Sequence, residues 1–176
     1  RFGDRTDVLV NSHNWPVWGQ ESVHQFMLEQ RDIYKYVHDQ TLRLANHGMT
    51  IKEVGDALQE PDFARDALHT RGNYGMLYFN ARAVYQKYYG AFDGRAVDLN
   101  PLPPETEGKR YLKALGGEAR VLELAQEAID EDDLQWAATL VNHAVFAGSP
   151  SAEARTLLAT IYRNMAYRAE SGIERN

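Results

Sequence analysis

The sequence contains no cysteine, so its 176 residues can form neither disulfide bonds nor thiolate zinc sites. It also lacks any apolar run of the roughly 18 residues that a membrane-spanning helix needs, and we therefore predict no membrane span. Basic residues are scarce, since 19 Lys and Arg stand against 25 Asp and Glu and give a formal net charge of -6. Nucleic-acid binding needs a clustered excess of basic side chains, so we predict no nucleic-acid partner.

Complete catalytic motifs are missing as well. The six histidines form no HxH, HxxxH or HExxH pair, and the sequence has no GxSxG elbow, P-loop or glycine-rich dinucleotide turn. A full zinc site cannot be assembled from these residues alone. The chain begins with Arg1 rather than Met and has no signal-peptide pattern, so we expect a piece of a longer protein whose compartment the sequence leaves open.

Apolar residues recur every three or four positions over most of the chain, which predicts a mainly α-helical fold. Short apolar runs that could form strands occur only near the start. The predicted helices cover residues 21–47, 50–59, 74–89, 104–116, 121–129, 136–145 and 150–165, with one or two further turns within 63–68.

Helix boundaries are well marked in the first half. The apolar stripe of 21–47 includes Met27 and Tyr34, and Gly48 follows it as a left-handed stop. Thr50 and Glu53 then have the spacing of a capping box, in which each residue satisfies the backbone N–H of the other.

The segment 74–89 differs because it is apolar on several sides. One stripe of this segment and its continuation is aromatic, whereas other apolar residues occupy the remaining faces. Such a helix is typical of the middle of an assembly, so we predict that the aromatic stripe lies in the core or in a dimer interface. It consists of Tyr74, Tyr78, Ala81, Tyr85, Tyr88 and Phe92.

The C-terminal part reads as stacked helical hairpins. An acidic turn at Asp130 to Asp133 reverses the chain, and Trp136 and Tyr162 lie on the apolar stripes of the helices that follow. Ser149 and Pro150 have the pattern of an N-cap and a first-turn proline. Similar pairs of adjacent apolar residues recur along the sequence at a separation close to the length of one tetratricopeptide repeat. This separation favours a helical hairpin bundle of that kind.

His13 is the one candidate metal ligand that the residue pattern suggests. It follows the short apolar run Val8 to Val10, which we interpret as a buried strand, and Trp15 and Trp18 are placed to pack behind it. A rigid strand end that faces a cleft suits a metal ligand. A single histidine without a partner motif is more often structural, so the residues alone leave open whether His13 binds a metal or only supports its turn.

Several segments are similar to the alkyl sulfatase family of zinc hydrolases, which have the metallo-β-lactamase fold. They resemble the end of its catalytic domain followed by its dimerisation domain, in the same order and over nearly the whole chain. The segments are SHNWPVWG at 12–19, QRDIYKYVHDQTLRLANHG at 30–48, RGNYG at 71–75, NARAVYQKYYGAFDG at 80–94, NPLPPE at 100–105, WAATLVNHAVFA at 136–147 and YRAESG at 167–172.

The resemblance implies a mainly α fold with a short N-terminal strand left from the metallo-β-lactamase domain. Residues 1–19 would be the terminal strand and metal-ligand loop of the catalytic domain, and 20–176 the helical dimerisation domain. It implies a homodimeric enzyme that hydrolyses alkyl sulfate esters with two zinc ions, for which His13 supplies the last ligand and an upstream HxHxDH cluster most of the others. This chain alone would be inactive, and the resemblance points to a periplasmic or secreted parent.

Three further residues are candidates for lining the sulfate or alkyl pocket. An Arg71 guanidinium matches an oxyanion, and a Tyr74 hydroxyl or an Asn80 amide can donate to one. Structural roles stay open for them, because Arg71 could cap a helix or pair with Asp66 and Tyr74 could lie in the core.

The sequence departs from the family pattern at three positions near the expected pocket. Asn14 stands where many relatives have a second histidine, Phe79 precedes Asn80 where His-Asn is usual, and Ala91 replaces a common Trp. These changes leave the reaction less certain than the fold. The alternatives are a metallo-β-lactamase-fold hydrolase acting on another ester, and a helical-repeat interaction module without catalysis.

Overall fold

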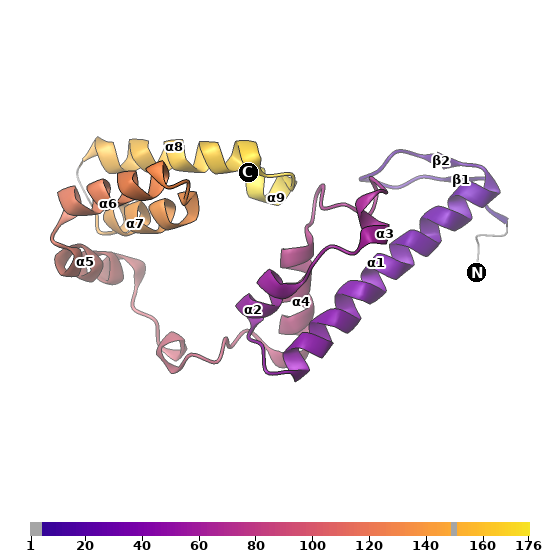
Figure 1. Cartoon of the computed structure of the whole chain (residues 1–176), viewed down its shortest axis with the longest axis horizontal. Coiled ribbons are helices and arrows are strands. Elements are labelled where there is room, and N and C mark those ends of the chain that lie inside the picture. Colours follow the sequence, from indigo (N-terminus) through magenta and orange to yellow (C-terminus); the bar gives the residue numbers. More distant parts are fainter. Residues whose placement is uncertain (1–4, 149–150) are drawn as a thin grey trace. The chain divides into compact units, whose positions relative to one another are not determined.

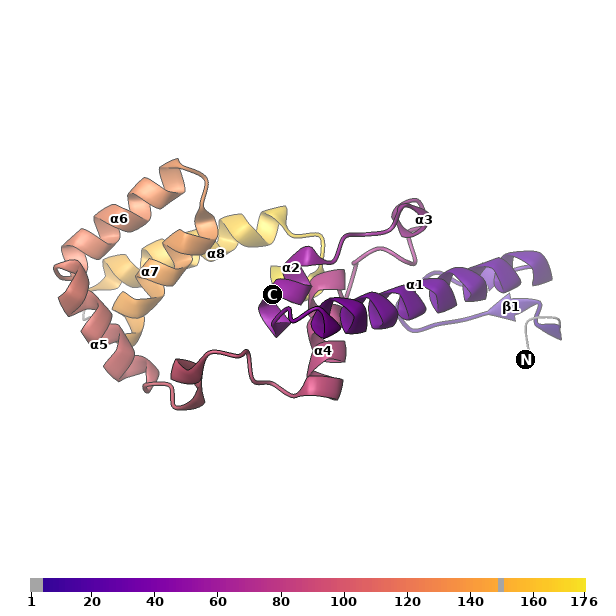
Figure 2. The same ribbon diagram turned by 60° about the horizontal axis from the view of Figure 1, so that its bottom comes forward.

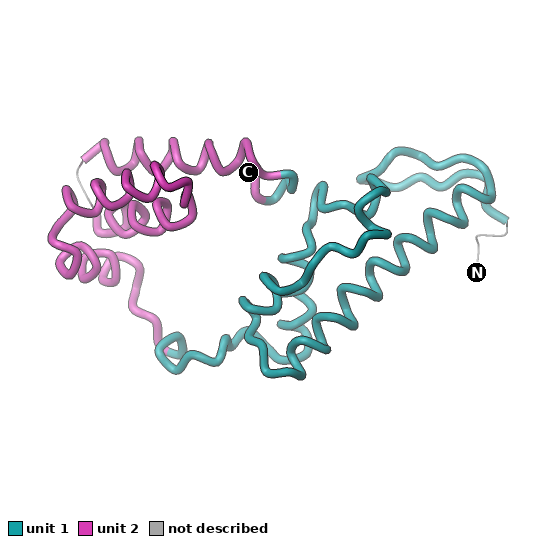
Figure 3. The backbone as a smooth tube through the Cα atoms, in the orientation of Figure 1, with its two compact units in different colours: residues 1–99, 170–173 teal, residues 100–169, 174–176 magenta. Residues whose placement is uncertain are grey.

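The computed structural model describes residues 5–148 and 151–176, and these residues are mainly helical (Figure 1). The chain divides into two compact units (Figure 3). Unit 1 contains residues 1–99 and 170–173, and unit 2 contains residues 100–169 and 174–176. The predicted fold class is confirmed, whereas the predicted domain boundary between residues 19 and 20 stays a prediction.

Unit 1 begins with a two-stranded antiparallel ladder of β1 (Val8–Leu9) and β2 (Val17–Trp18). The expectation of a buried strand is wrong, because Val8 is 46% exposed and no other strand among the described residues covers β1. The expected packing behind His13 is also absent from the described chain. Trp15 is 82% exposed and Trp18 is 64% exposed, since a two-residue ladder offers almost no surface to pack against.

The long helix α1 (Gln20–Asn46) follows β2 and ends as predicted, with Gly48 at a φ of 91°. Val23, Val37 and Leu44 on its apolar stripe are buried. Tyr34, on the same predicted stripe, is 72% exposed, because no element of the described chain covers that position.

The capping box at the start of α2 (Ile51–Ala57) is confirmed. The backbone N–H of Thr50 donates to Glu53 Oε2 at 2.8 Å, and the N–H of Glu53 donates to Thr50 Oγ1 at 3.5 Å. The Thr50 backbone donor stabilises the charged carboxylate and so holds the pKa of Glu53 below its ordinary value. A single turn, α3 (Asp62–Arg65), follows where one or two turns were expected.

Helix α4 (Leu77–Tyr89) packs against α1 and α2, as Figure 2 shows. It begins three residues later than predicted, because the RGNYG segment forms bends and Met76 caps the helix in an extended conformation. Tyr74 therefore lies before the helix rather than on it. The middle of the predicted stripe does face the core of unit 1: Ala81 is buried, Tyr85 packs against the core, and Tyr78 is partly buried. The ends of the stripe, Tyr74, Tyr88 and Phe92, are exposed within this chain.

A buried carboxylate anchors the segment that follows α4. Asp93 Oδ1 accepts a hydrogen bond from the backbone N–H of Arg95 at 3.1 Å, and Asp93 Oδ2 lies 3.4 Å from Lys52 Nζ on α2. The Arg95 N–H is the main reason that the pKa of Asp93 falls below its ordinary value, and burial opposes this shift. The short 3-10 helix η2 (Ala96–Leu99) completes this part of unit 1.

Unit 2 is a bundle of helical hairpins, as predicted. Helix α7 (Leu134–Phe146) packs against α5 (Pro104–Leu115), α6 (Glu118–Asp130) and α8 (Ala152–Arg168). The one-turn α9 (Gly172–Arg175) has its first two residues in unit 1 and its last two in unit 2. Trp136 and Tyr162 were expected to face inward but are about half exposed. The inward positions are filled by smaller neighbours, which include Ala137, Leu140, Val141, Ala154, Leu158 and Ile161.

The turns of unit 2 differ in detail from the expected caps. Ser149 and Pro150 lie outside the described residues, and the N-cap of α8 is Ser151, whose Oγ accepts from the Glu153 N–H at 3.0 Å. The acidic reversal before α7 is confirmed. There Asp133 accepts from the backbone N–H of Trp136 at 2.9 Å, and Asp132 takes a φ of 64°.

Glycine at position 108 allows α5 and α7 to approach each other closely. A Cβ added to Gly108 would lie 2.5 Å from the carbonyl oxygen of His143 and 2.9 Å from the backbone nitrogen of Ala147. One turn away the His143 ring stacks on Tyr111, with centroids 4.1 Å apart. His143 thus belongs to the contact between the two helices.

Among the described residues, no helix combines the length and the apolar character that crossing a bilayer requires.

Replacing Gly108 with Ala should destabilise unit 2, although Gly to Ala inside a helix normally stabilises by about 0.5–1 kcal/mol. The added methyl group must push two backbones apart, which costs about 1–3 kcal/mol. Urea unfolding followed by circular dichroism should show a net loss. Lys113→Ala, at an exposed position of the same helix, is the control and should change stability by less than about 0.5 kcal/mol. A Gly108→Ala chain that is more stable would contradict the close approach.

Replacing Asp93 with Asn should lower thermal stability at neutral pH and much less in acid. The folded-state pKa of Asp93 lies below its unfolded value, so its contribution is present above an unfolded pKa of about 3.9. It is lost as the pH falls through the lower folded pKa. Unfolding midpoints of both proteins between pH 7 and pH 2 measure this effect, with exposed Asp56→Asn as the control. A difference that is independent of pH would show that the charge of Asp93 is not what stabilises this segment.

Candidate functional site

His13 and Tyr74 lie against each other in unit 1, although 60 residues of sequence separate them. His13 is exposed on the connection between β1 and β2, and its ring stacks on that of Tyr74. The ring centroids are 4.9 Å apart and the planes differ by 13°. Among the described residues, neither ring nitrogen of His13 has a hydrogen-bond partner. The stack therefore supports the imidazole and leaves its nitrogen atoms accessible.

Asn80 lies beside the same bend. It occupies the first turn of α4, and a Cβ added to Gly75 would lie 3.3 Å from Asn80 Oδ1. The Asn80 amide therefore lies against the backbone of Gly75, the residue that follows Tyr74. Of the four predicted site residues, His13 and Tyr74 are in direct contact.

Arg71, the fourth predicted residue, forms an ion pair rather than remaining available for an anion. Its Nη2 lies 2.6 Å from Glu170 Oε1, and both side chains are partly exposed. The alternative pairing with Asp66 is therefore wrong. An anion that reached Arg71 would have to compete with the Glu170 carboxylate, and a sulfate-binding role for Arg71 stays a prediction.

Residues 170–173, which we call the clasp, bind the loop that carries Tyr74. Ser171 is buried, and its Oγ donates to the carbonyl oxygen of Tyr74 at 3.1 Å and accepts from the Ile173 N–H at 3.2 Å. The Gly172 N–H donates to the carbonyl oxygen of Asn73 at 2.9 Å. Sequence reasoning missed these contacts, and its only signal for them was the YRAESG segment at 167–172.

Sequence reasoning also missed the pair of His69 and Glu29, which joins the segment between α3 and α4 to α1. His69 Nε2 lies 2.7 Å from Glu29 Oε2, and the His69 ring packs on Phe26 with centroids 4.2 Å apart. The carbonyl oxygen of His69 also accepts from Gln30 Nε2 at 2.5 Å. These contacts hold the start of the loop that leads to Arg71 and Tyr74.

The donor set of this region fits one zinc ligand but not a whole site. Over residues 5–148 and 151–176, no group of three His, Cys, Asp or Glu side chains is placed to hold a metal ion. An imidazole nitrogen is a ligand that zinc accepts readily, and His13 presents an imidazole with a supported ring face. Any further ligands would have to come from outside the described residues.

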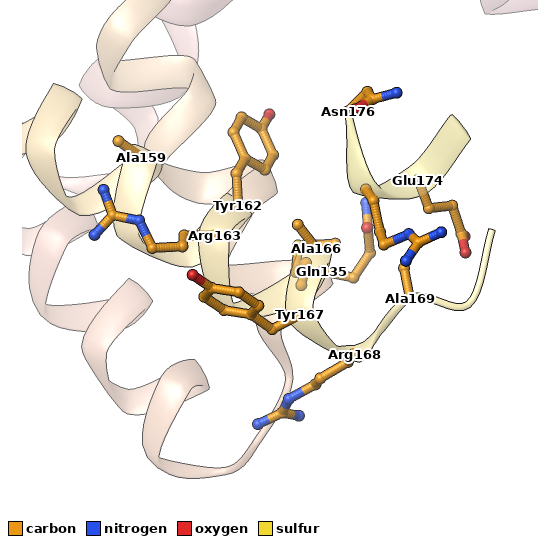
Figure 4. Close-up of a pocket in the computed structure, with 12 residues that line it drawn as sticks. Gln135, Ala159, Tyr162, Arg163, Ala166, Tyr167, Arg168, Ala169, Glu174 and Asn176 are labelled. Atoms are coloured by element: carbon orange, nitrogen blue, oxygen red, sulfur yellow. The ribbon is translucent and has the colours of Figure 1, made fainter. Parts of the chain in front are cut away.

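Unit 2 contains a wide groove, shown with its side chains in Figure 4. It has a volume of about 950 Å³ and is lined by residues of α7, α8 and the end of the chain. Tyr162, Tyr167 and Arg163 contribute to its wall. None of the predicted site residues lines this groove.

The relatives that this chain matches are alkyl sulfatases. An (R)-specific secondary alkylsulfatase of Pseudomonas sp. is 41% identical over 100% of the chain, and the chain covers 27% of that protein. An alkyl/aryl-sulfatase of Saccharomyces cerevisiae is 41% identical over 99% of the chain, which again covers 27% of the relative. The chain thus spans about a quarter of the length of these proteins.

Solved structures and family comparison agree with this similarity. The structure of the stereoselective inverting sec-alkylsulfatase Pisa1 from Pseudomonas sp. matches 99% of the chain with a TM-score of 0.92 and 41% identity, and the match covers 28% of that protein. The family model described as alkyl sulfatase dimerisation matches residues 50–176. This chain therefore belongs to the alkyl sulfatase dimerisation family.

Proposed function

We propose that this chain is the dimerisation region of a zinc-dependent alkyl sulfatase and that His13 is one of the zinc ligands of that enzyme. The observation that carries the proposal is the 41% identity to a secondary alkylsulfatase along the whole chain, including the segment around His13. The stacking of His13 on Tyr74 supports it, because a ligand needs a fixed ring and accessible nitrogen atoms.

In this proposal the residues of the chain hold the metal and orient the substrate, whereas the metal supplies most of the positive charge at the site. Bound zinc supplies positive charge that lowers the pKa of water and offsets the charge of the sulfate oxygens. His13 would hold the metal through a ring nitrogen, and Tyr74 stacks on the imidazole and restrains its plane. The Tyr74 hydroxyl and the Asn80 amide are donors that could orient an ester oxygen near that nitrogen.

The proposed substrates are alkyl sulfate esters, because the relatives are named for secondary and for linear primary alkyl sulfates. The three departures from the family pattern leave room for a different ester. Of these, Phe79 packs edge-on against Tyr78, with ring centroids 5.4 Å apart, so it adds apolar surface near Asn80 where relatives usually have His. A phosphate ester is the competing substrate class that the experiment must exclude.

The proposed partner is a second copy of the chain. Within unit 1 the end of α4 and the residues after it expose aromatic side chains, with Tyr88 at 50% and Phe92 at 49%. These residues belong to the stripe that the sequence placed in the core or in a dimer interface, and the chain does not bury them. We therefore place part of the dimer interface at Tyr88 to Phe92.

Replacing His13 with Ala in the full protein should lower bound zinc by about one ion per subunit. Hydrolysis of dodecyl sulfate and of secondary alkyl sulfates should fall by on the order of 100-fold. Loss of a residue that only orients a metal ligand lowers activity by about 10–100-fold, and loss of the ligand itself should lower it at least as much. Metal analysis and sulfate release measure the two effects. His24→Ala, at an exposed position of α1, is the control and should change neither quantity. Unchanged zinc would reject the ligand role, and a preference for phosphate esters would reject the sulfatase.

Sedimentation of the full protein at micromolar concentration should show a dimer. Phe92→Asp places a charge in the proposed interface and should shift the population toward monomer, because burying an unpaired carboxylate is costly. Tyr167→Asp, at an 85% exposed aromatic position of unit 2, should leave the dimer intact. A monomeric parent protein would contradict the proposed assembly, and a dimer insensitive to Phe92→Asp would contradict the proposed location of the interface.

A further inference from the structure

We infer that Ser171 is a positioning residue that fixes the orientation of His13 through Tyr74. The inference rests on the proposed function in so far as His13 is a zinc ligand. It assigns a role to the clasp, which lies 97 residues beyond the loop that it binds.

The contacts of Ser171 are those of a residue that holds a backbone in place. Its side chain is buried, and one hydroxyl bridges the carbonyl oxygen of Tyr74 and the N–H of Ile173. A serine hydroxyl can donate and accept at the same time, so one buried side chain satisfies a backbone group on each segment. Without the hydroxyl, both of these partly buried backbone groups would lose their partner, which costs stability.

The other clasp contacts act on the same loop. Gly172 binds the carbonyl oxygen of Asn73, and Glu170 pairs with Arg71. Three nearby residues of the loop are therefore bound by three consecutive residues of the clasp. An isolated hydrogen bond would restrain one peptide group, whereas this arrangement restrains the loop as a whole.

The position of the Tyr74 ring depends mainly on that backbone. Its side chain is 64% exposed, and its ring contact within the described chain is with His13. Because little else packs on the ring, a shift of the backbone at Tyr74 would shift the ring and with it the surface on which His13 rests. The path from Ser171 to His13 thus has one intermediate residue.

The consequence for the metal ligand is quantitative. A productive site holds its ligands within about 0.5 Å and 10–20° of the required geometry. Loss of a partner that orients a ligand typically costs about 10–100-fold in metal affinity. Since Ser171 acts through another residue, we expect an effect near the lower end, about tenfold.

Zinc release from the full protein into a chelator tests this path with a double-mutant cycle. Ser171→Ala and Tyr74→Leu should each weaken zinc binding, by about tenfold for Ser171→Ala. The double variant should be no worse than Tyr74→Leu alone, because both changes interrupt the same path. Tyr74→Phe keeps the ring and should keep the zinc affinity, and exposed Ser22→Ala is the matched control. Additive effects of the two changes would overturn the inference.

Proton NMR of the metal-free protein provides a readout that does not depend on zinc. The Tyr74 ring shifts the His13 ring protons while the two stack, and Ser171→Ala should move these resonances toward those of an unstacked histidine. Glu170→Gln, which removes only the exposed ion pair, should move them less and in the same direction, so the test survives if Ser171→Ala fails to fold. Unchanged His13 resonances in both variants would overturn the inference. If these resonances move while His13→Ala retains all its zinc, the positioning of His13 stands and its role as ligand falls.

Discussion

Residues from the far end of the sequence bind the loop from Arg71 to Tyr74 and restrain its shape. That loop has no regular structure, and glycines at positions 72 and 75 give its backbone a wide choice of conformations. The hydrogen bond from Ser171 to the Tyr74 carbonyl group removes that choice, and the neighbouring clasp contacts reinforce it. The stacked pair of His13 and Tyr74 depends on this restraint, as does the geometry of any ligand that the pair presents.

Local rules predicted most of the secondary structure. The capping box at Thr50 and the stop at Gly48 follow from spacing within a few residues, and both are present. The aromatic helix began later than predicted, because the turn preference of RGNYG outweighed the apolar spacing at Tyr74. Burial was harder to predict. Tyr34 and Trp136 have the right spacing for a buried stripe, yet burial requires a covering element and spacing does not supply one.

The candidate site was predictable only in part, for the same physical reason. His13, Arg71, Tyr74 and Asn80 stand in segments that resemble a known family, and the structure brings His13 and Tyr74 into contact and places Asn80 beside Gly75. The contacts that hold them are non-local. Ser171 lies 97 residues from Tyr74, and the pairing of Glu29 with His69 joins a helix to a loop 40 residues away. No periodicity or motif in one sequence reports such pairs, so they became visible only with the fold.

The exposure of the indole side chains gives this chain an unusual optical property. Tryptophan is highly buried in most folded proteins, but the three in this chain, Trp15, Trp18 and Trp136, are all more than half exposed. Their fluorescence therefore reports contact with water even when the helices are fully formed. Emission would change less as this chain unfolds than it does for buried indoles, and it would also respond when another surface covers the two most exposed ones, Trp15 and Trp18.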